Sequence, residues 1–229
     1  ETIEKAEEGR EVELFLDRTP FYAESGGQIG DSGTIITPTG TMTVNDTQYA
    51  VPGLHGHRGT VTSGVIQLGQ DADLTISHER RERIRKNHTG THILHWALRE
   101  VVGDHVHQAG SLVADDRLRF DFSHYHGMSA EEMRDVELAA NERVIENAAV
   151  LTLETSKSEA EKMGALAFFG DKYGERVKVY SIGKFSKELC GGPHVHNLRE
   201  IGTFKIKKEE ACAKGVRRIR ATVTGPESS

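Results

Sequence analysis

Two short motifs, far apart in the chain, constrain the fold more than any other feature because each holds two potential metal ligands. NHTGTHILH places His88 and His92 four residues apart, so on a helix both imidazoles project from one face. KELCGGPHVHN places Cys190 four residues before His194, around a Gly-Gly-Pro turn. Zinc binds sulfur and imidazole nitrogen together. We therefore predict that the two motifs meet and hold Zn²⁺ with these four side chains.

Other interpretations of the same residues remain open. Two histidines four residues apart can arise by chance, and His88 and His92 would then lie on the surface of a helix. Cys190 can also be interpreted as a small buried hydrophobic residue. His95 is a rival ligand because it shares the helix face, but the Cys-His half already completes four ligands. Cys212 has no partner at metal-binding spacing, so we expect it to pack in the interior.

The composition indicates a soluble globular protein of 229 residues, with 36% hydrophobic and 28% charged residues. No apolar run approaches the roughly 18 residues that a membrane span needs. The start is charged, which argues against a secretory signal, and the missing initiator Met suggests a fragment or a processed product. Only two cysteines are present, so we expect a reducing compartment, the cytoplasm, and no disulfide framework.

The pattern of residues divides the chain near position 78. Residues 1–77 contain segments in which polar and apolar residues alternate, separated by Gly, Asp and Asn: EVELFL, GTIITP, TMTVND and RGTVTSG. Short, evenly spaced strands of this kind predict a small β-barrel subdomain. Residues 78–229 then form the zinc-binding subdomain.

The second subdomain mixes helices and strands. Apolar spacing predicts a long helix from residue 78 to Gly103, and Ser129 with Glu132 forms a capping box that starts a second helix. A short helix follows the strand VLTLET, and further strands are expected at ERVKVYSIG, GTFKIKKE and GVRRIRATVTG. Because βαβ alternation is absent, we predict an α+β fold with a mostly antiparallel sheet.

Two other features of the sequence can be interpreted either as purely structural or as functional. In RTPFYAESGGQIGDSG, Gly26 and Gly27 form either a hairpin turn or a loop that brings Gln28 close to a ligand. The net charge of −6 argues against general nucleic-acid binding, so such binding needs a local basic patch. Runs of basic residues usually form a solvated surface, but they can also bind the phosphates of a substrate. The arginines that we predict to contact RNA phosphates are Arg80, Arg81, Arg85, Arg217 and Arg218.

Five motifs in order resemble the editing domain of alanyl-tRNA synthetase: TPFYAESGGQIGDSG, NHTGTHILH, GSLVADDRLRFDFSH, FGDKYGERVKVYSIGKFSKELCGGPHVH and GVRRIRATVTG. The resemblance covers the chain from about Val12 to Gly225. It implies a small β-barrel followed by a zinc-containing α+β domain. The implied activity is hydrolysis of tRNA(Ala) mischarged with serine or glycine, with the remaining synthetase domains as partners. The aminoacylation domain is missing, so this chain should not charge tRNA.

The resemblance also implies roles for individual residues. The four predicted metal ligands fall on the family's zinc positions, Gln28 on the glycine-rich motif that faces the editing pocket, and Thr89 and Thr91 inside the histidine motif. The family usually has threonine at Pro193 and a small residue, often alanine, at Gly90, and these departures leave the substrate preference open.

Pocket energetics explain why editing is needed. One methylene separates ligands by only about 1–3 kcal/mol, and an added hydroxyl is equally hard to exclude. A second site that hydrogen-bonds the serine hydroxyl solves this, and the candidate partners are Gln28, Thr89 and Thr91. Four protein ligands are typical of structural zinc, so zinc either activates water with one loose ligand or orients the substrate. The alternatives are a non-catalytic zinc module that docks tRNA and a trans-acting deacylase of different specificity.

Overall fold

The computed structural model describes residues 2–167 and 174–224. These residues form two compact units: residues 2–25 with 29–81, and residues 26–28 with 82–167 and 174–224. The functional division at residue 78 stays a prediction. Residues 169–173 of the fourth family motif, and Gly225 at the end of the fifth, lie outside the described residues.

The first unit is built on a single antiparallel sheet. Its strands are β1 (Lys5–Glu7), β2 (Glu11–Phe15), β3 (Gly33–Thr37), β4 (Gly40–Val51), β5 (Leu54–Gln67) and β6 (Asp73–Ile76). The strand order is β1-β5-β4-β3-β6, with β2 also paired to β5. The inward-facing apolar residues of the alternating segments form its core, including Ile35, Met42, Val44 and Val61.

The described strands of this unit do not close into the predicted barrel. Closure needs a pair between the two outer edges of the sheet. One edge of β5 is occupied in succession by β2 and β1, while the short β6 pairs with β3. Within the described residues no pair joins β6 to β1 or β2, so the sheet is open and this part of the prediction is not confirmed.

The second unit contains the remaining elements. They are α1 (His78–Val102, whose first four residues belong to the first unit), β7 (Gln108–Val113), β8 (Leu118–Ser123), α2 (Ala130–Ile145), β9 (Val150–Ser156), α3 (Lys157–Lys162), β10 (Arg176–Ile182), β11 (Ser186–Leu189), the 3₁₀ helix η2 (Leu198–Ile201), β12 (Phe204–Ala213) and β13 (Val216–Val223). They make a four-stranded sheet of order β12-β13-β8-β7 and a three-stranded sheet of order β11-β10-β9, both antiparallel. The predicted mixed α and β class with antiparallel sheets is confirmed.

The predicted helix boundaries follow local chemistry. Helix α1 ends before Gly103, whose φ of 127° is accessible to a residue without a Cβ, and whose N–H bonds the Arg99 carbonyl. Helix α2 starts with the predicted capping box, in which Ser129 and Glu132 each accept from the other's backbone N–H. Both helices are therefore confirmed.

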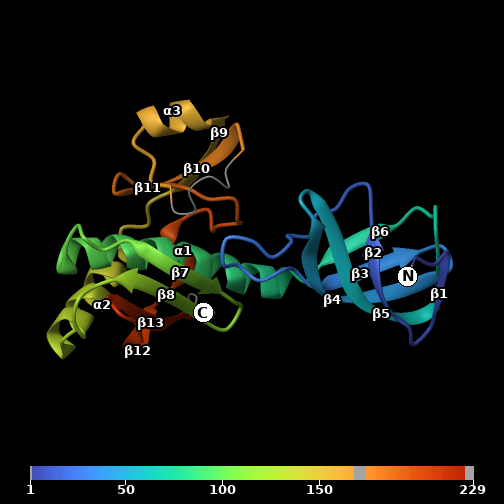
Figure 1. Ribbon diagram of the computed structural model, residues 1–229, viewed down its shortest axis with the longest axis horizontal. Helices are drawn as coiled ribbons and strands as arrows, with labels where there is room; N and C mark the ends of the chain where they lie inside the picture. The colour runs from blue at the N-terminus through green and yellow to red at the C-terminus, as the bar shows by residue number, and fades with distance from the viewer. Residues whose placement is uncertain (1, 168–173, 225–229) are drawn as a thin grey trace. The chain divides into compact units, whose positions relative to one another are not determined.

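The main core of the second unit lies between α1, α2 and the four-stranded sheet (Figure 1). Helix α1 contributes Ile93, Leu94 and Leu98, all almost fully buried, and β8 contributes Phe120 and Phe122. This packing holds the middle of α1 rigidly, which matters because the histidine motif lies there. Among the described residues, no helix combines the length and apolar character needed to span a bilayer.

Candidate metal centre

Helix α1 presents the first pair of predicted ligands from one face. His88 and His92 are both buried, and their rings lie 5.4 Å apart between centroids with an angle of 22° between planes. One helical turn separates them, as the spacing predicted. Because α1 is anchored in the core, this half of the site is fixed before any ion binds.

The second pair lies in the segment that follows β11. The Cys190 N–H bonds the Lys178 carbonyl of β10, which fixes the position of the thiol. Gly192 passes so close to α1 that a Cβ built on it would lie 2.3 Å from His88 Cε1, whereas one built on Gly191 meets nothing within 4 Å. Only glycine fits at position 192, which accounts for one of the two glycines in the motif.

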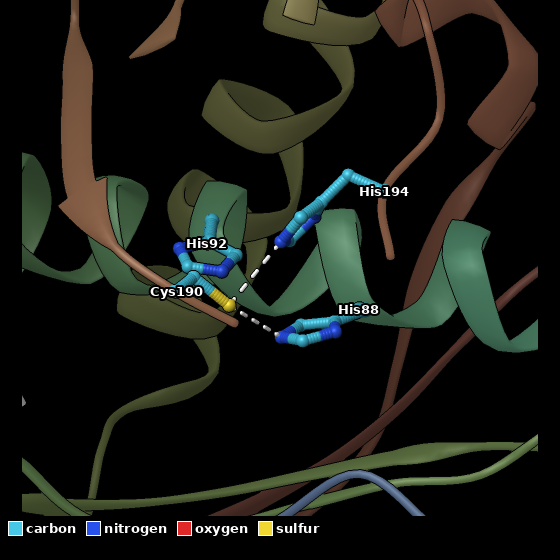
Figure 2. Close-up of side chains that lie close together, drawn as sticks. All are labelled: His88, His92, Cys190 and His194. Carbon is cyan, nitrogen blue, oxygen red and sulfur yellow. Dashed lines mark hydrogen bonds between the residues drawn. The ribbon is translucent and has the colours of Figure 1, made fainter. Parts of the chain in front are cut away.

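The four side chains converge, as Figure 2 shows. Cys190 Sγ lies 3.2 Å from His88 Nε2 and 3.3 Å from His194 Nε2, and the ligand atoms of all four lie within 4.8 Å of one another. Around a tetrahedral zinc, with Zn–N of about 2.0–2.1 Å and Zn–S of about 2.3 Å, sulfur and nitrogen ligands stand about 3.6 Å apart. The cluster can therefore hold a metal ion, and its donor set fits zinc.

Each of the three imidazoles is oriented through its other nitrogen. The Nδ1 of His88 bonds Gln28 Oε1 at 2.6 Å, and the Nδ1 of His194 bonds Thr89 Oγ1 at 3.0 Å. The Nδ1 of His92 bonds a carboxylate oxygen of Glu188, which is itself buried. When each Nδ1 donates its proton to such an acceptor, the Nε2 of the same ring carries a lone pair that can bind a metal ion. Metal-binding histidines in proteins usually have an acceptor of this kind at the other ring nitrogen.

Burial shifts the protonation of the cluster. It lowers the pKa of His88 to about 4, and together with neighbouring histidine charges it holds the pKa of His92 and of His194 well below the usual value. Burial also raises the pKa of Cys190 to about 12. The imidazoles are therefore neutral at pH 7, the form that binds metal, and the thiol keeps its proton unless a cation compensates the thiolate.

The structure tests the predictions for two other potential ligands, His95 and Cys212. His95, the rival ligand, is outside the four-residue cluster, and its Nδ1 lies 3.4 Å from Glu188 Oε1. The expectation that Cys212 packs in the interior is wrong, because Cys212 is exposed. It lies at the exposed end of β12 between Ala211 and Ala213, which are also exposed, and has no register partner on β13.

The glycine-rich segment brings Gln28 to the cluster. Gly26 and Gly27 have φ of 60° and 83°, which favours glycine, and a Cβ on Gly27 would lie 2.7 Å from the Ser111 carbonyl oxygen. The Gly27 carbonyl accepts from the Val113 N–H at 2.7 Å. Gln28 is thus fully buried against His88, and its Nε2 has no hydrogen-bond partner in the described part of the chain.

The two predicted threonines differ in how fully they are bonded. Thr89 Oγ1 donates to the Arg85 carbonyl at 3.0 Å and accepts from His194 and from the Val195 N–H. Its hydroxyl is saturated. Thr91 Oγ1 donates to the Asn87 carbonyl one turn earlier and keeps acceptor capacity. Thr89 therefore orients a ligand, and Gln28 and Thr91 retain free hydrogen-bonding capacity.

The five arginines predicted to contact tRNA all have acceptors within the chain. Arg80 bonds the Gly30 carbonyl, Arg81 pairs with Asp31, Arg85 with Glu82, Arg217 with Glu209, and Arg218 with Asp121. The Arg81 side chain is only 15% exposed, so it serves the interior of the first unit. A role of these arginines in tRNA binding stays a prediction.

Sequence reasoning missed Glu188, which contacts both His92 and His95. It stands two residues before Cys190, so its presence in the second motif was visible. Its side chain direction was not, because that depends on β11 pairing with β10 beside α1.

Two family models match the chain. Residues 177–220 match the model described as the threonyl and alanyl tRNA synthetase second additional domain, and residues 1–80 match that of class II (A) tRNA synthetases. Both models describe parts of tRNA synthetases, and the first match includes Cys190 and His194 of the cluster.

Curated relatives identify the family more closely. Alanine–tRNA ligases of Bacillus velezensis and Rhizobium meliloti are each 49% identical, over 97% and 96% of this chain, which cover 25% and 26% of those proteins. The ligase of Xanthomonas campestris is 50% identical over 97% of the chain and 25% of its own length. The chain is thus homologous to about a quarter of an alanyl-tRNA synthetase, and the family resemblance indicated by its motifs is confirmed.

Proposed function

We propose that this chain is the editing part of an alanyl-tRNA synthetase, and that it hydrolyses the ester bond of tRNA(Ala) mischarged with serine or glycine. The family relation supports an editing role in general, and the cluster of His88, His92, Cys190 and His194 supports a metal at its centre. A zinc ion bound there would supply Lewis acidity close to the substrate. The proposed partners are tRNA(Ala) and the remaining synthetase domains, and the proposed location is the cytoplasm.

The observation that carries the substrate proposal is the Gln28 amide. Its Oε1 is held by His88, so its Nε2 points with a fixed orientation, and this donor is buried without a partner among the described residues. A buried unpaired donor costs about 1–3 kcal/mol, and a substrate hydroxyl relieves that cost while a methyl group does not. We assign Gln28 Nε2 as the donor to the serine hydroxyl, which selects serine over alanine.

The neighbouring residues hold this donor in place. Thr89 fixes His194, and Gly27 holds the backbone of Gln28 against Val113. Orientation by already bonded groups matters because a misplacement of about 1 Å reduces rate as strongly as the loss of a contact. Thr89 therefore acts only by orienting His194, whereas Gln28 orients His88 through Oε1 and contacts the substrate through Nε2.

The test is deacylation of Ser-tRNA(Ala) and Ala-tRNA(Ala) by wild type, Gln28→Ala and Cys190→Ala, with the zinc content of each protein measured. We expect wild type to release serine and spare alanine, and Cys190→Ala to lose zinc and activity together. Gln28→Ala also removes the hydrogen-bond partner of His88, so it is assayed with zinc in excess, and there we expect it to lose selectivity. A zinc-loaded, folded wild type without deacylation would favour the non-catalytic docking module. Release of a different amino acid would favour another specificity.

A further inference from the structure

A row of aromatic rings runs from the core of the second unit to its surface at the end of β8. Phe122 and His124 lie 6.2 Å apart between centroids with planes 22° apart, and His124 and His105 lie 5.1 Å apart at 26°. Tyr125 continues the row, 5.7 Å from His105 at 21°. Four rings thus lie nearly parallel, and the last of them faces solvent.

The outermost ring is both exposed and held in place. Tyr125 is 87% exposed, while His124 in the middle of the row is buried. His105 Nε2 and His124 Nδ1 share a hydrogen bond of 2.9 Å. Ser123 ties the two segments together, since its hydroxyl donates to the His105 carbonyl at 2.7 Å. Tyr125 stacks on His105, which is itself hydrogen-bonded to His124, so a fixed ring lies behind the exposed one while most of the Tyr125 surface stays open to a planar partner.

Positive charge lies beside this surface. The backbone N–H of His124 bonds the carbonyl of Gly215 in the β12–β13 turn, so the backbone of the exposed Lys214, one residue earlier, lies near His124. A Cβ built on Gly127 would lie 3.3 Å from the Arg217 guanidinium. The charges of Arg217 and Glu209 offset each other as an ion pair, and the Glu132 carboxylate is held at the start of α2 by the Ser129 N–H, so Lys214 is the cation that we assign to this surface.

We propose that Tyr125, backed by His105 and His124, stacks against an unpaired base of RNA while Lys214 contacts the adjacent phosphate. A flat ring with one free face and a flanking cation is the arrangement that binds single-stranded nucleic acid. An apolar protein partner fits less well, because imidazoles and charged groups surround the single exposed ring. The identification of the RNA as tRNA rests on the proposed function; the stacking surface itself does not.

The test compares binding of uncharged tRNA(Ala) by wild type, Tyr125→Ala and Tyr125→Trp. Stacking on one aromatic side chain contributes about 1–3 kcal/mol, so we expect Tyr125→Ala to weaken binding by about 5- to 150-fold and Tyr125→Trp to bind at least as tightly as wild type. Ile145→Ala is the matched control, since Ile145 is 73% exposed in the same unit and lies outside the ring row. Circular dichroism checks that each variant folds.

Salt and fluorescence readouts separate stacking from charge. We expect Tyr125→Ala to leave the salt dependence of binding unchanged, whereas Lys214→Gln lowers the slope by about one phosphate contact. A single strand carrying 2-aminopurine should lose fluorescence on wild type and not on Tyr125→Ala. Equal affinity of wild type and Tyr125→Ala, or an equal loss in Ile145→Ala, overturns the proposal. Tyr125-dependent binding without deacylation supports the stacking surface and contradicts only the proposed function.

Discussion

The sharpest test of the metal centre is the addition of one methyl group, Gly192→Ala. The new Cβ would lie 2.3 Å from His88 Cε1, 2.6 Å from His88 Nδ1 and 2.9 Å from Gln28 Oε1. Non-bonded carbon atoms sit at about 3.5–4.0 Å, so either the His88 ring or the backbone at position 192 must move by about 1 Å. Both belong to the site, and neither is the free end of a flexible side chain.

Two costs follow from this geometry. Overpacking a filled interior costs about 1–3 kcal/mol. Displacing His88 also breaks its 2.6 Å bond to Gln28 and its 3.2 Å approach to Cys190. Loss of an orienting partner typically lowers metal affinity 10- to 100-fold, which is about 1.4–2.8 kcal/mol. We therefore expect zinc affinity to fall at least tenfold in Gly192→Ala.

Gly191→Ala provides the matched control, because a Cβ at that position meets nothing within 4 Å. Competition with a chromophoric chelator measures zinc affinity for both variants at pH 7, and urea unfolding of the metal-free proteins measures the packing cost separately. We expect Gly191→Ala to behave as wild type in both assays. Equal zinc affinities for the two variants would refute the steric reasoning and the placement of His88 beside Gly192.

Three further predictions concern other residues. Glu188→Ala removes the acceptor of His92, and we expect zinc affinity to fall about 10- to 100-fold in chelator competition, with a smaller loss for Glu188→Gln; equal affinity for Glu188→Ala and wild type would exclude the orienting role. In the metal-free protein, burial lowers the pKa of His88 from 6.5 to about 4. The contribution of neutral His88 to stability is therefore fully present above pH 6.5 and falls by about 3 kcal/mol as the pH drops to 4. A free energy of unfolding in urea that stays constant from pH 7 to pH 4 would contradict this. Asp31→Ala leaves the largely buried Arg81 charge without its carboxylate, and we expect thermal unfolding to show a loss of about 3–5 kcal/mol; an unchanged melting temperature would count against it.

The sequence was informative where function depends on residue type and local spacing. His88 and His92 are related by one helical turn, so their common face followed from the helix alone. Cys190 and His194 are related by a short turn, and a thiol with an imidazole at that spacing favours zinc over a merely buried cysteine. Each half was therefore predictable, and the meeting of the two halves was inferred from ligand chemistry before any contact was known.

Features that depend on tertiary pairing were not predictable. On β7 a register irregularity between Gln108 and Gly110 interrupts the alternation, so the sequence does not indicate this strand. Strand β8, LRFDFS, alternates cleanly, so it was predictable and the family motif alone was recognised there. The open sheet of the first unit was interpreted as a barrel, since alternation specifies strands but not whether the outer edges pair. Cys212 is exposed together with its neighbours Ala211 and Ala213 at the end of β12, and this depends on what packs over that end of the strand.

The arrangement around the cluster bears on how a four-ligand site can serve hydrolysis. Three imidazoles and one thiol fill a tetrahedral shell, so such a site resembles structural zinc more than catalytic zinc. However, His88 is also hydrogen-bonded to Gln28, whose Nε2 is the buried donor without a partner among the described residues. A metal ion that fixes the His88 ring would therefore also fix the Gln28 amide, which is the group proposed to bind the serine hydroxyl. On this argument the cluster controls selectivity by holding Gln28 in place, and metal removal should erase the preference for serine even where residual deacylation survives.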